Sequence, residues 1–105
     1  MAFTPVGKST RTTLTTTAVS ITCPATAHLV LVTNGTTVAA GNVLYVDIAT
    51  TAVIPVNGGA TGGVPILPQQ RILFDKGNAT TISLIGSAAS TDSLVSFGAA
   101  SAGVA

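Results

Sequence analysis

Charged side chains are scarce in this 105-residue sequence, and glutamate is absent altogether. Only 7% of the residues are charged, whereas Asp, Glu, Lys and Arg make up about a quarter of a typical soluble domain. The charged residues are Lys8, Arg11, Asp47, Arg71, Asp75, Lys76 and Asp92. Threonine, alanine, valine and glycine leave little surface charge to keep copies of the chain apart, so we expect other protein to cover much of the surface.

Aromatic residues are also few: they make up 4% of the chain, and tryptophan is missing. Proteins that bind single-stranded nucleic acid need aromatic rings on which bases stack, together with a basic groove. The net charge of +1 is too small to attract a nucleic acid. We therefore expect no nucleic-acid partner, and a core built from Val, Ile, Leu and Ala.

Long hydrophobic runs are missing as well. The longest clean run is Leu29–Val32, whereas a membrane-spanning helix needs about 20 mainly apolar residues. The N-terminal residues lack the basic start and the apolar segment of a secretion signal. The single cysteine, Cys23, fits synthesis in a reducing compartment because it has no intrachain disulfide partner. We therefore expect no membrane partner.

Residues that could carry out catalysis are few and far apart in the sequence. Paired-carboxylate catalysis needs two neighbouring acids, and Asp75 and Asp92 adjoin a turn and a strand start, where a carboxylate usually accepts hydrogen bonds from backbone amides. His28 is the only histidine, and its spacing from Cys23 is not that of metal ligands. We therefore expect a protein that is not an enzyme, with no catalytic residue, cofactor or metal.

What the sequence does contain is a pattern of short strands. β-Branched residues dominate, glycine and proline recur as breaks, and no stretch shows the 3.6-residue period of a helix. The pattern predicts an all-β domain over residues 11–98, an antiparallel β-sandwich or a jelly-roll-like small barrel. Residues 1–10 are expected to form an extended N-terminal arm, and residues 99–105 a C-terminal tail. Alternation predicts an inward group and an outward group in one strand: Leu44, Val46 and Ile48 inward, Tyr45 and Asp47 outward.

The dipeptide Asn34-Gly35 follows the most apolar strand and is the strongest short-range signal for a β-hairpin. Both residue types tolerate the positive φ angles of a type I′ turn. A two-residue turn at this point would place Leu31 opposite Val38 on the neighbouring strand. The sequence therefore predicts a hairpin centred on these two residues.

The strand before that turn is apolar on both faces. The expected hairpin puts Leu29 and Leu31 on the core face, so Val30 and Val32 lie on the other. A strand that is apolar on both faces is covered on both sides. We therefore expect a neighbouring subunit to cover Val30 and Val32.

Several motifs together suggest a family. The segment Ile66–Asp75 contains a Leu-Pro-x-x-Arg step and leads into an expected hairpin that continues through Gly77–Ile85. An early strand ends in Val-Thr-Asn at Val32–Asn34, and the last strand ends in Phe97-Gly98. In these motifs, and in its length and composition, the chain resembles small virion proteins of tailed bacteriophages. Gln69-Gln70 stand where that family usually has an acidic residue.

The resemblance implies a capsid decoration, or cement, protein that is synthesised in the host cytoplasm and binds the capsid surface of the virion. Its partners would be the major capsid protein and further copies of itself, with a trimer favoured over a dimer by analogy. One alternative is a tail, fibre or head-fibre module that binds a host-surface glycan. A small hydrolase is the other.

Contacts with partners are expected to involve the arm and the two-sided strand. Phe3 and Val6 would fill apolar grooves on a neighbouring subunit or on the capsid, and Arg11 would meet an acidic group there. On this interpretation, deleting residues 2–8 weakens attachment and leaves the melting temperature nearly unchanged; the alternative is that Met1–Lys8 frays. The predicted interface residues are Phe3, Val6, Lys8, Arg11, Val30, Val32 and Arg71.

Overall fold

A computed structural model of the chain describes residues 3–7, 9–48, 50–55 and 62–100. These residues form nine β-strands and no helix, in two antiparallel sheets packed together as a small β-sandwich. The all-β prediction is therefore confirmed. The strands are β1 (Phe3–Pro5), β2 (Thr10–Leu14), β3 (Val19–Thr22), β4 (Leu29–Asn34), β5 (Leu44–Ile48), β6 (Val64–Ile66), β7 (Arg71–Asp75), β8 (Thr81–Gly86) and β9 (Thr91–Ala100).

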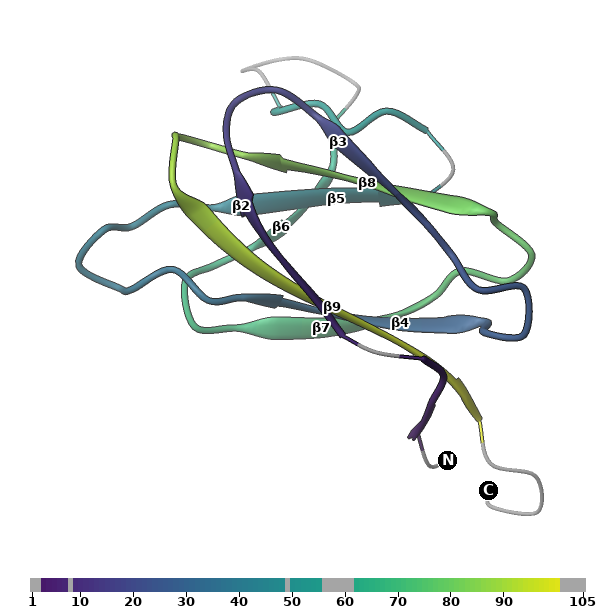
Figure 1. The fold of residues 1–105 in the computed structure, drawn as a ribbon. Helices are drawn as coiled ribbons and strands as arrows, with labels where there is room; N and C mark the ends of the chain where they lie inside the picture. The colour runs from purple at the N-terminus through teal and green to yellow at the C-terminus, as the bar shows by residue number, and fades with distance from the viewer. Residues whose placement is uncertain (1–2, 8, 49, 56–61, 101–105) are drawn as a thin grey trace.

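The strand order is that of a jelly roll. The first sheet has the order β2-β9-β4-β7, with β1 also pairing with β9, and the second sheet has the order β3-β8-β5-β6. The pairs β2–β9, β3–β8, β4–β7 and β5–β6 are nested, as if one long hairpin had been folded over itself. In Figure 1 the layer of β3, β8 and β5 lies above the layer of β4 and β7.

The core lies between the two sheets and consists almost entirely of aliphatic side chains. Alternation along each strand sends every second residue inward. In β5, Leu44 and Val46 are buried while Tyr45 and Asp47 are only partly covered, as predicted. The largest apolar side chains that are fully buried are Leu14, Val30, Val32, Leu44, Val46, Ile66, Ile82, Leu84 and Val95.

The predicted hairpin at Asn34-Gly35 is wrong. Asn34 is the last residue of β4, and β4 pairs with β7 and β9 rather than with the residues that follow it. Neither Asn34 nor Gly35 has a positive φ, and Val38 is 73% exposed on a loop. The reason is that the Asn34 side chain is buried and bonds three backbone groups, so this position ends a strand instead of turning it back.

The predicted faces of β4 are reversed. Val30 lies beside Phe97 of β9, and Val32 beside Val95, so both valines point into the core. Leu29 and Leu31 point to the outer face of the first sheet. The prediction assigned the two faces of this strand from the expected contact of Leu31 with Val38. Because the hairpin does not form, that contact does not exist.

The N-terminal arm lies on its own chain. β1 pairs with β9, and the Val6 amide donates a hydrogen bond to the Phe97 carbonyl at 2.9 Å. The Val6 side chain packs against the core, and β2 already begins at Thr10. At the other end, β9 continues to Ala100 and so runs past the expected domain limit at residue 98; residues 101–105 lie outside the described residues.

Candidate functional site

The outer face of the first sheet presents exposed apolar side chains. Leu31 lies between Leu73 of β7 and Ser96 of β9, and Thr33 lies between Arg71 and Leu94. Leu73 is 49% exposed and Leu94 is 39% exposed. We call this surface the outer face and define it by these residues: Leu29, Leu31, Thr33, Arg71, Leu73, Asp75, Leu94 and Ser96.

One end of the outer face is closed by the arm. Gly98 is the register partner of Leu29, and the Phe3 ring occupies the space where a side chain on Gly98 would stand. A Cβ at Gly98 would lie within 2.5 Å of the ring. Leu29 is 4% exposed although it belongs to the outer face. Phe3 is therefore used within the chain rather than in a groove on a partner.

Most of the predicted interface residues are not free to contact a partner. Val30 and Val32 are 0% exposed in the core, so predicting them as interface residues was wrong. Val6 packs against the same core. Lys8 lies outside the described residues. Arg71 remains, exposed at the first residue of β7.

Arg11 is exposed too, but it pairs with an acid of its own chain. Its Nε donates to Oδ1 of Asp92 at 3.0 Å and its Nη2 donates to Oδ2 at 2.8 Å, which is a bidentate pair. The hydrogen bond and the charge of Asp92 raise the pKa of Arg11. Because the carboxylate already neutralises this guanidinium, an acidic group on a partner would have to compete with Asp92.

The buried side chain of Asn34 organises the loops at the same end of the sandwich. Its Nδ2 donates to the carbonyls of Asn42 and Ile66, both at 2.9 Å, and its Oδ1 accepts from the Thr36 amide at 3.0 Å. Asn34 is 0% exposed. Both N–H groups of the side-chain amide and one of the two lone pairs on its oxygen are thus engaged, and three separate segments are held together.

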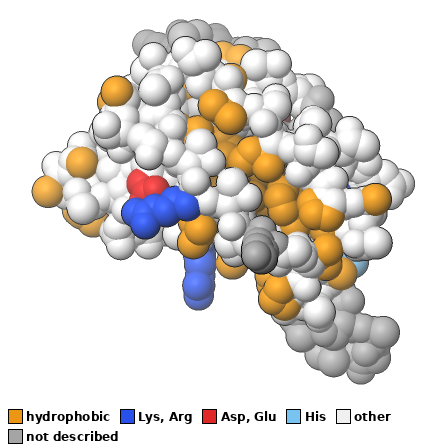
Figure 2. All heavy atoms as spheres, in the orientation of Figure 1, with side chains coloured by type: hydrophobic (Ala, Val, Ile, Leu, Met, Phe, Trp, Pro, Cys, Tyr) orange, Lys and Arg blue, Asp and Glu red, His pale blue; other side chains and the backbone are white. Residues whose placement is uncertain are grey.

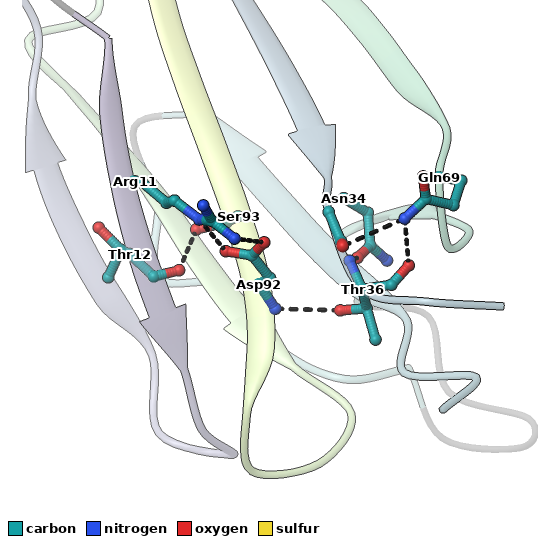
Figure 3. Close-up of polar contacts among 8 residues, drawn as sticks. Arg11, Thr12, Asn34, Thr36, Gln69, Asp92 and Ser93 are labelled. Carbon is teal, nitrogen blue, oxygen red and sulfur yellow. Dashed lines mark hydrogen bonds and ion pairs between the residues drawn. The ribbon is translucent and has the colours of Figure 1, made fainter. Parts of the chain in front are cut away.

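Gln69 and Asp92 extend this network (Figure 3). Gln69 has a φ of 65°, and its Nε2 donates to the carbonyls of Gly35 at 3.1 Å and Thr36 at 2.9 Å. The Thr36 hydroxyl accepts from the Asp92 amide at 3.0 Å. Gly35 lies so close to Asp92 that a side chain there would collide with the carboxylate. The network fixes the geometry of loops; its donors and acceptors are occupied by the protein itself.

A small pocket lies near the start of the β3–β4 connection. It has a volume of about 180 Å³ and is lined by Cys23, Pro24 and residues 76–80 among others. Lys76 is 6% exposed, and its Nζ donates to the Ala79 carbonyl at 3.0 Å. Burial raises the pKa of the Cys23 thiol, and the charge of Lys76 partly opposes this effect. The thiol is therefore held in its protonated, unreactive form.

We expect Cys23 to react with a thiol reagent at pH 8 at least about tenfold more slowly in the folded protein than in urea. Two causes act together, since the side chain is 8% exposed and its raised pKa leaves little thiolate. The measurement is the rate of colour release by a disulfide reagent, with the urea-unfolded chain as the control. Equal rates in the two states would contradict this placement of the thiol.

The structure also bears on metal and membrane binding. Within residues 3–7, 9–48, 50–55 and 62–100, no three His, Cys, Asp or Glu residues are grouped so that they could hold a metal ion. In the same residues, no helix is long and apolar enough to cross a membrane. Searches for similar proteins give no match: no protein family, curated protein or solved structure is similar to this chain.

Proposed function

We propose that this protein is a non-catalytic structural component of a bacteriophage virion. In this proposal, many copies bind the outer surface of the capsid, associate with one another and with the major capsid protein, and so stabilise the shell. The jelly-roll order supports the proposal because capsid domains of viruses often have this architecture. Architecture alone does not assign a function, so the proposal depends on the surface.

The observation that carries the proposal is the outer face. Its exposed leucines lie among hydroxyl and methyl groups, with Arg71 and Asp75 on β7 as its charged residues. The Arg11–Asp92 ion pair borders it at Leu94, the register partner of Arg11. Figure 2 shows one side of the molecule, where hydrophobic side chains form a band and few charged groups appear. Exposed apolar surface with a polar surround is typical of a site that contacts other protein.

The first experiment is to count copies in purified particles. Mass spectrometry against the major capsid protein should give on the order of hundreds of copies per particle, as expected for a protein that repeats with the symmetry of a shell. A value in the tens would favour the fibre or head-fibre module that binds a glycan. Absence from purified particles would overturn both.

A second experiment tests the surface itself. Leu94→Asn should reduce occupancy on particles that lack the native protein, because it places an amide in the middle of the outer face. Val38→Asn is the matched control, since Val38 is more exposed but lies on a loop away from this sheet. Equal occupancy of the two variants would show that the outer face does not make the contact.

A further inference from the structure

The outer edge of β7 is an unpaired strand edge. Among the described residues, β7 pairs with β4 on one side and with no strand on the other. The edge strand β6 contains Pro65, and β1 contains Pro5, which remove backbone donors and discourage pairing. β7 contains neither proline nor glycine, a property that it shares with the edge strands β2 and β3, so its free edge is able to accept another strand.

The backbone of β7 presents alternate residues to that edge. The Asn34 amide donates to the Gln70 carbonyl at one end of the β4–β7 ladder, and the Lys76 amide donates to the His28 carbonyl at the other. In an antiparallel ladder the hydrogen-bonded residues alternate, so Ile72 and Phe74 also face β4. The N–H and C=O groups of Arg71, Leu73 and Asp75 therefore point away from β4, toward the free edge.

The side chains of the same three residues are complementary to themselves. Arg71 and Asp75 lie at opposite ends of the strand, both are exposed, and Leu73 lies at its centre. When two such strands run antiparallel about Leu73, each Arg71 stands opposite Asp75 of the second copy. Arg71 makes no hydrogen bond or ion pair with any other described residue, so its charge is available. Asp75 accepts one bond from the Gly77 amide through Oδ1, and its other carboxylate oxygen is open to a partner.

We propose that two copies of this chain pair through β7, edge to edge, about a two-fold axis at Leu73. The hydrogen-bonded pairs of the new ladder are then Arg71–Asp75, Leu73–Leu73 and Asp75–Arg71. In this register, the N–H and C=O groups that point to the free edge of one copy meet those of the other copy. Ile72 lies opposite Phe74 of the second copy on the inner face. The two first sheets become one continuous sheet, and the two outer faces join into one larger surface.

This arrangement is a closed, isologous contact and gives a dimer, in place of the trimer that the family resemblance implied. The inference rests on the self-association that is part of the proposed function and names the surface that makes it. The two can fail separately. If the protein coats particles but sediments as a monomer, the β7 pairing is overturned and the capsid attachment is not. If the protein is a dimer but is absent from particles, the capsid attachment is overturned and the β7 pairing is not.

The test is sedimentation velocity of the purified full-length protein, combined with circular dichroism of each variant. The native chain should sediment as a dimer at micromolar concentration. Arg71→Asp places two carboxylates opposite each other twice per dimer and should raise the dissociation constant about tenfold or more. The double variant Arg71→Asp/Asp75→Arg reverses both charges together and should return the constant to within about threefold of the native value.

A second variant tests the pairing without changing charge. Leu73→Pro removes an N–H that points to the free edge and takes part in no β4 hydrogen bond, so the strand spectrum should persist while the dimer is lost. Leu73→Thr is the control and should remain dimeric. A native monomer or trimer, or a dimer that survives both Arg71→Asp and Leu73→Pro, would overturn the proposal. If the double variant does not fold, the comparison of Leu73→Pro with Leu73→Thr decides the question.

Discussion

Replacing Asn34 with alanine is expected to lower the free energy of unfolding by about 3 kcal/mol. The substitution removes two donated bonds and one accepted bond in a site that is 0% exposed. The carbonyls of Asn42 and Ile66 and the amide of Thr36 then lose their partner, and an unpaired buried polar group costs more than a bond contributes on average.

Urea denaturation followed by circular dichroism measures this loss, with Asn42→Ala as the matched control. The Asn42 side chain makes one bond, to the Ala89 carbonyl at 3.2 Å, and Asn34 binds the backbone carbonyl of Asn42, which the control keeps. We expect the control substitution to lower the free energy of unfolding by less than about 1 kcal/mol. Equal costs for the two variants would show that Asn34 does not hold the loops together.

Deleting residues 2–8 is expected to lower the stability by about 2–4 kcal/mol and the melting temperature by about 10 °C or more. The deletion removes β1 from β9, the Val6 contact with the core and the Phe3 ring over Gly98. This outcome is the opposite of the prediction made from the sequence, in which the deletion leaves the melting temperature nearly unchanged.

Calorimetry of the truncated chain measures the shift. Pro5→Ala is the control, since Pro5 is exposed and lies between the two anchoring residues, and it should change the stability by less than about 0.5 kcal/mol. A truncated chain that melts at the native temperature would contradict the intramolecular placement of the arm and return it to the role of a contact with partners.

The fold class could be predicted because each strand carries its own signal. The alternation in Leu44–Ile48 is readable from five residues, and prolines and glycines mark the breaks between strands. The faces of β4 could not be predicted in this way because Val30, Val32, Leu29 and Leu31 are all apolar. Only the partners across the sheet distinguish them, and these partners come from residues about 40 and 65 positions later.

The hairpin prediction failed for a related reason. The dipeptide Asn34-Gly35 satisfies the local rule for a tight turn, yet here the asparagine amide donates to the carbonyls of Asn42 and Ile66, and the glycine makes room for Asp92. Gln69, one of two consecutive glutamines after a Leu-Pro step, is the one sequence feature that could have pointed to this network. Its contacts with Gly35 and Thr36 were visible only in three dimensions.

The nested strand pairs set a constraint on the order in which the molecule can be built. β9 is the last strand of the described residues, yet it lies inside the first sheet, between β4 on one side and β1 and β2 on the other. During synthesis, β2 and β4 must therefore wait with unsatisfied edges until residues 91–100 have left the ribosome. Closing such long loops is slow, so the nascent chain is most exposed to mispairing just before its final strand arrives.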